Sequence, residues 1–177
     1  MKYLIASDIH GSLYFAKKLI NQIKIEEPDK IVLLGDLYYH GPRNPLPEDY
    51  NPKEVANLLN TIKDKIICTR GNCDAEVDQM ISDFKIVSNK KIKFCGKSIM
   101  FTHGHKYNID NPANNVDILI YGHFHTGFIK LKNNKIFANP GSISLPKENT
   151  PNSFLVLENK AITLKTIEGN IIENYLF

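Results

Sequence analysis

The sequence predicts an α/β protein in which two packed β-sheets carry helices on the outside. The first observation is an alternation of strand and helix patterns early in the chain. Short apolar runs predict buried strands at Lys2–Ala6, Lys30–Leu34 and Lys65–Thr69. Apolar residues at helical spacing predict helices at Ser12–Lys24, with Ser12 as the N-cap, and at Lys53–Ile62. This alternation implies crossover connections and therefore parallel strand pairing.

The second observation is a change of pattern in the second half, where short apolar runs are separated by turn residues. Asn133-Asn134, between two such runs, predicts a hairpin turn because Asn tolerates a positive φ. A parallel half followed by a strand-rich half predicts two sheets packed on one another. The strands predicted in this half are Phe84–Ser88, Lys91–Cys95, Ser98–Thr102, Asp117–Tyr121, Gly127–Lys132, Lys135–Ala138, Phe154–Leu157 and Ala161–Ile167.

The composition is that of a globular protein of mixed charge. The chain has 22 Lys and Arg residues against 19 Asp and Glu, and a net charge of +3 is too small to indicate a nucleic-acid or membrane surface. No apolar run could span a bilayer, and Asp8 interrupts the apolar start too early for a signal peptide. Three cysteines without a paired framework fit free thiols in a reducing compartment. We therefore expect one cytoplasmic domain spanning residues 1–177.

Seven side chains that suit metal binding occur in five short motifs, each just past a predicted strand, where ligands gather in α/β sheets. They are Asp8, His10, Asp36, Asn72, His103, His123 and His125. Asp8 and His10 are two residues apart, and in an extended segment this spacing points both side chains the same way. His123 and His125 repeat the pattern. Gly35, Gly71 and Gly122 precede three of the motifs and predict close backbone approach or an unusual φ.

The order of these motifs predicts a two-metal hydrolase site, because paired divalent cations bind through oxygen and imidazole ligands. Each motif alone is weak, since an isolated Asp-x-His is usually a surface pair and an isolated Gly-Asn a turn. The prediction therefore rests on the complete ordered set. A structural zinc site is disfavoured because none of the seven side chains is a thiolate.

The ordered set Asp8-Ile9-His10, Gly35-Asp36, Gly71-Asn72, His103 and Gly122-His123-Phe124-His125 resembles that of the calcineurin-type metallophosphoesterases. Within that superfamily the chain is most similar to the small bacterial YfcE-like phosphodiesterases. The resemblance implies a four-layer α/β/β/α sandwich with two mixed sheets and a dimetal site at one edge of them. It also implies metal-dependent hydrolysis of a small phosphodiester by a hydroxide that bridges two metal ions.

The resemblance also assigns the ligands. Asp8, His10, Asp36 and His125 would hold one ion, and Asn72, His103 and His123 would complete the second. Asp36 would bridge the two ions, because a carboxylate offers two oxygens. Asp36, Asn72 and His103 are the residues expected to be most directly catalytic. Mn²⁺ is the leading metal, while Fe, Co, Ni, Zn or Mg also suit this set of donors.

Four further residues are candidates for substrate contact. Many superfamily members have His directly after the Gly-Asn motif, whereas this chain has Cys73, as the YfcE-like branch does, so the general acid stays open. Esters whose leaving groups need no proton should therefore react best. His40 and Arg43 lie in Tyr38–Pro52, a proline-rich excursion where a solvated charge is an equal alternative. His105 could face the cleft or pack behind it.

Several alternatives remain open at this stage. Within enzymes, the site could prefer phosphomonoesters or cyclic nucleotides. The retromer subunit that shares the fold is a protein-binding scaffold with a depleted metal site, but no ligand is missing here. A polymeric nucleic-acid substrate is disfavoured by the near-neutral charge. Homo-oligomers are common in the resembled family, although no segment identifies an interface. The physiological substrate and the metal used in the cell do not follow from the sequence.

Overall fold

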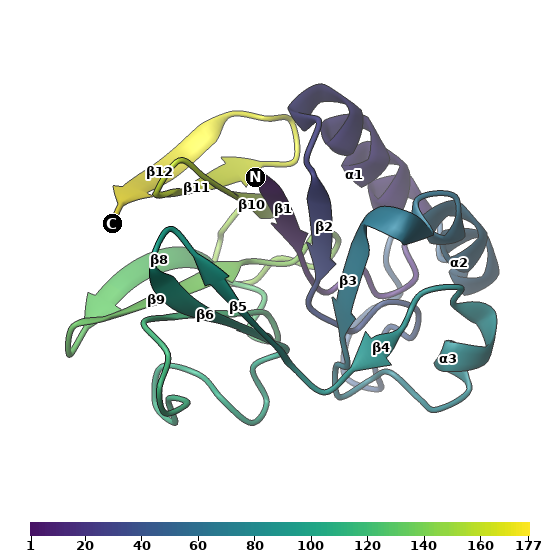
Figure 1. The fold of residues 1–177 in the computed structure, drawn as a ribbon. Coiled ribbons are helices and arrows are strands. Elements are labelled where there is room, and N and C mark those ends of the chain that lie inside the picture. The colour runs from purple at the N-terminus through teal and green to yellow at the C-terminus, as the bar shows by residue number, and fades with distance from the viewer.

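The computed structural model describes residues 1–177 as two β-sheets that pack face to face, with helices on the outside of one of them (Figure 1). The larger sheet has seven strands in the order β12-β11-β10-β1-β2-β3-β4. Strands β1 to β4 pair in parallel, and the strands from β10 to β12 add to the other side in antiparallel pairing. Their bounds are β1 Tyr3–Ala6, β2 Lys30–Leu33, β3 Ile66–Thr69, β4 Ile86–Val87, β10 Ser153–Glu158, β11 Ala161–Thr166 and β12 Ile171–Leu176.

The second sheet has five strands in the order β5-β6-β7-β9-β8. Strands β6, β7 and β9 are parallel, while β5 and β8 pair antiparallel at the two edges. The predicted hairpin turn between β8 and β9 is confirmed, because Asn133 and Asn134 have φ of 51° and 59°. The bounds are β5 Lys90–Phe94, β6 Lys97–Thr102, β7 Ile118–Tyr121, β8 Gly127–Lys132 and β9 Lys135–Pro140.

All the helices lie between residues 13 and 81: α1 Leu13–Glu26, α2 Pro52–Asn60, the 3₁₀ turn η1 Lys63–Lys65 and the one-turn α3 Asp78–Ile81. Helix α1 begins after Ser12, whose Oγ accepts from the Phe15 N–H at 3.3 Å, as the predicted N-cap requires. None of these helices combines the length and the apolar character that a membrane crossing needs.

Three buried clusters hold the layers together. Helices α1 and α2 bury residues such as Leu19 and Leu59 against Leu33 on the outer face of the seven-stranded sheet. Between the sheets, Ile5 lies in the same cluster as Phe101 and Ile120, which confirms the predicted packing of the sheets. On the far side of the second sheet, the loop 103–117 supplies apolar side chains, including Ala113 and Val116. A core shared by both sheets is consistent with one cooperative unit.

The sequence-based prediction placed most strands within one or two residues but missed β12 and α3. Strand β12 has Ile171 and Ile172 side by side, so it lacks the alternation of a half-buried strand. It is an exposed edge strand, with Ile171 66% exposed, and its pairing with β11 shifts register at Leu164 and Lys165. Helix α3 is a single turn, too short to show a helical period.

Candidate metal centre

The five predicted motifs all lie where a strand ends, at adjoining edges of the two sheets. In the seven-stranded sheet the motifs of Asp8, Asp36 and Asn72 follow β1, β2 and β3, which are neighbouring parallel strands. In the second sheet His103 follows β6, and the Gly122 motif follows the parallel neighbour β7. Parallel strands end at the same edge, so the topology gathers three motifs on one sheet and two on the other, and the packing of the two sheets brings these sets together.

The backbone at the ligand positions differs from the expectation. The segments Asp8-x-His10 and His123-x-His125 were predicted to be extended, but the strands end before them. Five of the seven candidate ligands have a left-handed backbone: Asp8, His10, Asp36, His123 and His125, with φ of 57°, 50°, 53°, 70° and 63°. Asp and His are among the few residue types enriched at positive φ. The paired side chains therefore converge through tight turns, and Phe124 between the last two points outward with 43% of its surface exposed.

Hydrogen bonds between neighbouring loops hold these turns in place. The Asp8 N–H donates to the Gly35 carbonyl at 3.1 Å, and the His10 N–H donates to the Asp36 carbonyl at 2.9 Å. On the other side, the His123 N–H donates to Asp8 Oδ2 at 2.9 Å. The loops after β1, β2 and β7 are thus tied to one another through backbone groups as well as through the side chains.

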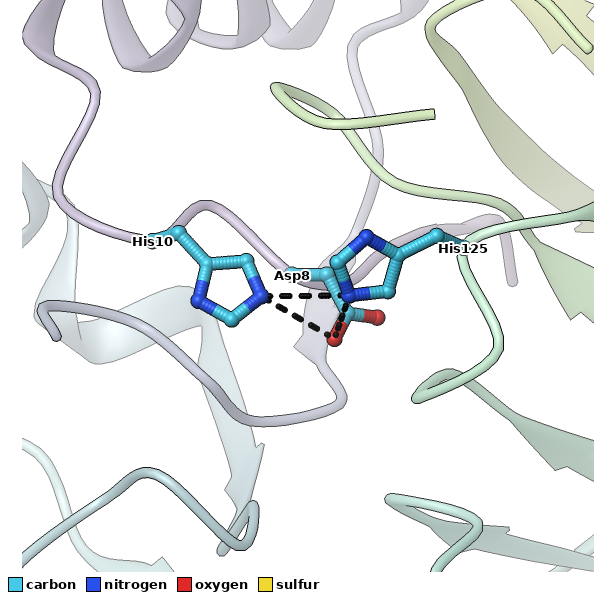
Figure 2. Close-up of side chains that lie close together, drawn as sticks. All are labelled: Asp8, His10 and His125. Carbon is cyan, nitrogen blue, oxygen red and sulfur yellow. Dashed lines mark hydrogen bonds and ion pairs between the residues drawn. The ribbon is translucent and has the colours of Figure 1, made fainter. Parts of the chain in front are cut away.

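Asp8, His10 and His125 form the most tightly gathered group (Figure 2). His125 Nε2 lies 3.3 Å from Asp8 Oδ1, and His10 Nε2 lies 3.6 Å from the same oxygen. The two Nε2 atoms are 3.2 Å apart. All three side chains are at least 97% buried. One oxygen and two nitrogens therefore face a common point that water does not reach freely.

A second group gathers around Asp36. Its Oδ2 lies 3.8 Å from His10 Nε2 on one side and 3.4 Å from His103 Nε2 on the other. His103 Nε2 lies 3.0 Å from Asn72 Oδ1. Asp36 Oδ1 instead accepts from the Cys73 N–H at 2.8 Å. A single oxygen, rather than both oxygens of the carboxylate, thus lies between the two groups.

His123 stands at the open side of this second group. Its ring centre is 5.1 Å from that of His103, and the side chain is only partly buried. Burial, together with His103, lowers the pKa of His123 below its ordinary value. A neutral imidazole at this place suits a ligand, because only the neutral ring offers a nitrogen lone pair.

Three histidines are oriented by backbone carbonyls. The Nδ1 atoms of His10, His103 and His125 lie 2.8, 2.7 and 2.6 Å from the carbonyls of Tyr39, Leu34 and Leu145. A carbonyl only accepts, so Nδ1 carries the hydrogen and Nε2 of the neutral ring presents its lone pair to the cluster. This is the second contact that metal-binding histidines usually make.

The donor set fits a divalent cation. With Nδ1 protonated, His10, His125 and Asp8 Oδ1 point lone pairs at one another, and Asp8 Oδ1 is buried without a hydrogen-bond partner. In the absence of metal such a set binds protons instead. Burial opposes a charge on His103, but Asp36 and Asp8 raise the pKa of His103 to about 9. Burial would likewise raise the pKa of Asp8, but the neighbouring imidazoles of His10, His125 and His103 hold it well below the ordinary value.

Two glycines are needed for the close approach of the loops. A Cβ on Gly71 would lie 2.0 Å from Asp36 Oδ1, and a Cβ on Gly122 would lie 1.9 Å from Ser7 Oγ. Both distances are far below contact, so any larger residue would displace a ligand loop. The predicted role of these glycines is confirmed.

Asp74 was not identified as a site residue from the sequence, yet it joins two ligand loops. Its Oδ2 accepts from the N–H groups of Asp36 and Gly71 at 2.8 and 2.7 Å, and its Oδ1 accepts from the Leu37 N–H at 2.8 Å. The side chain is buried. Its position next to Cys73 in the Gly-Asn motif was the available signal, because a buried carboxylate after a turn commonly accepts backbone N–H groups.

The turn at residues 139–142 also supports the site. Asn139 Nδ2 donates to the Gly122 carbonyl at 2.9 Å, and Ser142 Oγ donates to the Asp8 carbonyl at 2.7 Å. Both side chains are fully buried. They connect the turn after β9 to the loops after β7 and β1, so they are positioning residues for ligands on both sheets.

A cleft of about 710 Å³ opens at this cluster of candidate ligands. The predicted substrate residues Arg43 and Cys73 line it together with the candidate ligands Asn72 and His123. Lys147, which the sequence did not single out, lines it too. Burial, followed by the charge of Asp36, raises the pKa of the Cys73 thiol to about 12. The thiol is therefore a poor proton donor as well as a poor base.

The other two predicted substrate residues lie outside this cleft. His40 packs between Tyr39 and Tyr50, at ring-centre distances of 4.8 and 5.2 Å, and its Nδ1 is buried without a partner. His105 is exposed, and its ring centre is 5.5 Å from that of His103. It lines a separate recess on another side of the cluster.

Fold and site together define the class of protein: an α/β protein with two mixed sheets and a buried cluster of carboxylates and imidazoles suited to paired divalent metals. Residues 1–161 match the model of the calcineurin-like phosphoesterase superfamily domain. The chain belongs to this superfamily of metal-dependent phosphoester hydrolases.

Individual relatives agree with this assignment. The chain is 41% identical to phosphodiesterase YfcE of Escherichia coli K12 over 175 residues, which cover 97% of this chain and 95% of the relative. A solved structure of the E. coli phosphoesterase Yfce superposes with a TM-score of 0.95 at 36% identity, covering 99% of this chain and 98% of that one. A Vps29 structure from Entamoeba histolytica has a TM-score of 0.66 at 22% identity, covering 100% and 99% of the two chains, and so shares the fold alone.

Proposed function

We propose that this protein is a phosphodiesterase that uses two divalent metal ions. The observation that carries the proposal is the position of Asp36 Oδ2, 3.8 Å from His10 Nε2 and 3.4 Å from His103 Nε2. This oxygen joins the group of Asp8, His10 and His125 to the group of Asn72 and His103. Two ligand groups that share one carboxylate are the arrangement expected of a two-metal hydrolase. The name of the E. coli relative supports the choice of diesters.

The chain's own residues would divide the work as follows. Asp8, His10, Asp36 and His125 would hold one ion, and Asp36, Asn72, His103 and His123 the other. Bound divalent ions would supply activated water at neutral pH and would stabilise negative charge on the phosphoryl oxygens. Arg43 and Lys147, which line the cleft beside the ligands, would bind and orient the phosphate group. Asp74, Asn139 and Ser142 would keep the ligand loops in register.

Cys73 determines which leaving groups the enzyme handles well. It lies in the cleft beside the ligands, and in the metal-free protein burial and Asp36 raise the pKa of its thiol to about 12, so the thiol is a poor source of protons. Leaving groups of low pKa need no proton, so aryl and similarly acidic esters should be hydrolysed fastest. A steep decline of log kcat/KM with leaving-group pKa is the expected result, and a flat dependence would contradict this role.

We also propose Mn²⁺ as the metal in the cell, in keeping with the mixed oxygen and imidazole donor set. Three free cysteines support a reducing, cytoplasmic setting. The core shared by the two sheets supports a single domain. The exposed edge strand β12, with Ile171 and Leu176 66% and 72% exposed, supports self-association, which light scattering would detect.

The first experiment removes all metal, restores Mn²⁺, and compares bis(p-nitrophenyl) phosphate with p-nitrophenyl phosphate. Asp36→Asn keeps the size of the side chain but removes the shared anionic oxygen, so it should abolish turnover. Asp64→Asn, at an exposed position on η1, is the matched control and should keep wild-type turnover. Mn²⁺-dependent diester hydrolysis that Asp36→Asn loses supports the proposal. A faster monoester reaction would favour a phosphomonoesterase, and no turnover with any divalent metal would favour the protein-binding alternative.

A further inference from the structure

A second recess of about 210 Å³ adjoins the metal cluster at a different place from the main cleft. It is lined by Arg70, Gly71, Ser88, Asn89, Thr102, His105, Lys106 and Tyr107. The ring centre of His105 lies 5.5 Å from that of His103 and 6.3 Å from that of His123. No candidate ligand lines the recess, but His105 places it next to two ligands of the second group, so we expect a substrate whose phosphorus is placed there to reach it.

The positions of the two arginines also indicate an anion site in this recess. The chain has only two arginines, Arg43 and Arg70, while its other cations are lysines. Arg43 lines the main cleft and Arg70 lines the recess, so both arginines flank the metal cluster. Between Arg70 and the ligand Asn72 stands only Gly71. Arginine differs from lysine in offering a planar fork of donors that matches phosphate and carboxylate groups.

The positive charge of the recess is not neutralised by a carboxylate of the protein. Neither Arg70 nor Lys106 has a carboxylate within 4.0 Å, and no Asp or Glu lines the recess. Ser88 and Asn89 add neutral donors beside the two cations. Uncompensated cations with nearby donors, in a concave site, favour a bound anion.

We propose that this recess binds a second anionic group, a phosphate or carboxylate, carried on one arm of the phosphodiester substrate. The inference rests on the proposed diesterase function and adds the class of substrate to it. A recess of about 210 Å³ is less than a third of the volume of the main cleft, which suits an anionic group on a short linker. The other arm of the diester would occupy the larger cleft with Arg43 and Lys147.

The test compares p-nitrophenyl diesters that differ only in the second arm: propyl, 3-carboxypropyl or 3-phosphonopropyl. With Mn²⁺ at low ionic strength, the proposal expects kcat/KM for at least one anionic arm to exceed that for propyl by roughly ten- to a hundredfold. The arm that gains more identifies carboxylate or phosphate as the natural group. Arg70→Gln should bring this ratio close to one, and Arg70→Lys should keep part of it. Lys24→Gln, on the exposed end of α1, is the control and should keep the full ratio.

A second test measures anion binding directly and does not depend on catalysis. Inorganic phosphate titrated into metal-free protein should shift the amide NMR signals of Arg70, Asn89 and Lys106, and Arg70→Gln should abolish these shifts. If the propyl diester is hydrolysed but neither anionic arm is preferred, the inference is overturned and the diesterase function stands. If no diester is hydrolysed, the diesterase function fails and the titration decides: shifts lost in Arg70→Gln support an anion site, and their absence overturns it.

Discussion

Replacing Asp74 by Asn tests whether the metal site depends on a residue that would not contact metal. The carboxylate of Asp74 accepts three backbone N–H groups at 2.7 to 2.8 Å, from Asp36, Leu37 and Gly71. An Asn side chain of the same size has one carbonyl oxygen, which can keep the two bonds made by Oδ2. Its NH₂ group would then face the Leu37 N–H. Both groups are donors, so this hydrogen bond would be lost.

The expected cost follows from these contacts. One buried N–H left unpaired costs about 1–3 kcal/mol, and the two remaining bonds lose their charge assistance, about 1 kcal/mol each. The free energy of unfolding should fall by about 3–5 kcal/mol. At about 2–4 °C per kcal/mol for a chain of this size, Tm should fall by roughly 6–20 °C. Asp36 and Gly71 belong to two loops that hold candidate ligands, and these loops would shift when their bonds to residue 74 weaken. The affinity for Mn²⁺ and kcat/KM should therefore also fall, by about 10- to 100-fold.

Asp78→Asn is the matched control. Asp78 is also a buried carboxylate that accepts a backbone N–H, from Ala75 at 2.8 Å, but only one, and an Asn carbonyl can keep it. Thermal unfolding followed by circular dichroism, together with a Mn²⁺ titration, measures both variants. If Asp74→Asn unfolded at the same temperature as Asp78→Asn and retained wild-type kcat/KM, the positioning role of Asp74 would be refuted.

Three further predictions concern one candidate ligand and two residues that adjoin the ligands. In the metal-free protein the pKa of His103 is about 9, so below that pH a metal ion must displace the proton on its ring. The affinity for Mn²⁺ should therefore rise by up to tenfold per pH unit between pH 7 and about 9. An affinity that calorimetry finds to be independent of pH would contradict this prediction. Gly122→Ala would place a Cβ 1.9 Å from Ser7 Oγ and 2.7 Å from Asp8 Oδ2, so metal titration should show at least about a tenfold loss of affinity. Cys73→His should add a proton donor and flatten the dependence of log kcat/KM on leaving-group pKa, whereas an unchanged slope would exclude that effect.

The sequence predicted the fold well because its signals are local. The apolar runs of β1, β2 and β3 and the amphipathic pattern of α1 each lie within a few residues. Strand β12 was missed for the same reason. Its place at the sheet edge depends on pairing with β11, and its own residues are mostly exposed. Only the folded sheet gives that segment a reason to be a strand.

The site was predicted in its residue types but not in its backbone. Motif order and strand ends predicted that Asp8, Asp36 and His103 would gather. Asp8 and Asp36 do so because β1 and β2 are parallel neighbours, whereas His103 follows β6 of the other sheet and reaches Asp36 because the two sheets pack together. The positioning residues could not be found this way. Asp74 and Asn139 act through backbone groups of loops that are distant in the sequence, and no local pattern records such contacts. Arg70 was missed because its significance depends on the recess it lines.

The left-handed backbone at five ligand positions explains why the loops need so many supports. Each such residue costs of order 1–3 kcal/mol, less for Asp and His than for other side chains. Hydrogen bonds of about 0.5–1.5 kcal/mol each oppose this strain. Those made by the Asp8 and His10 N–H groups, by Asp74 and by Ser142 fall on the strained turns themselves. These hydrogen bonds help to hold the candidate ligands in position. Loss of one support should therefore weaken metal binding as well as the fold.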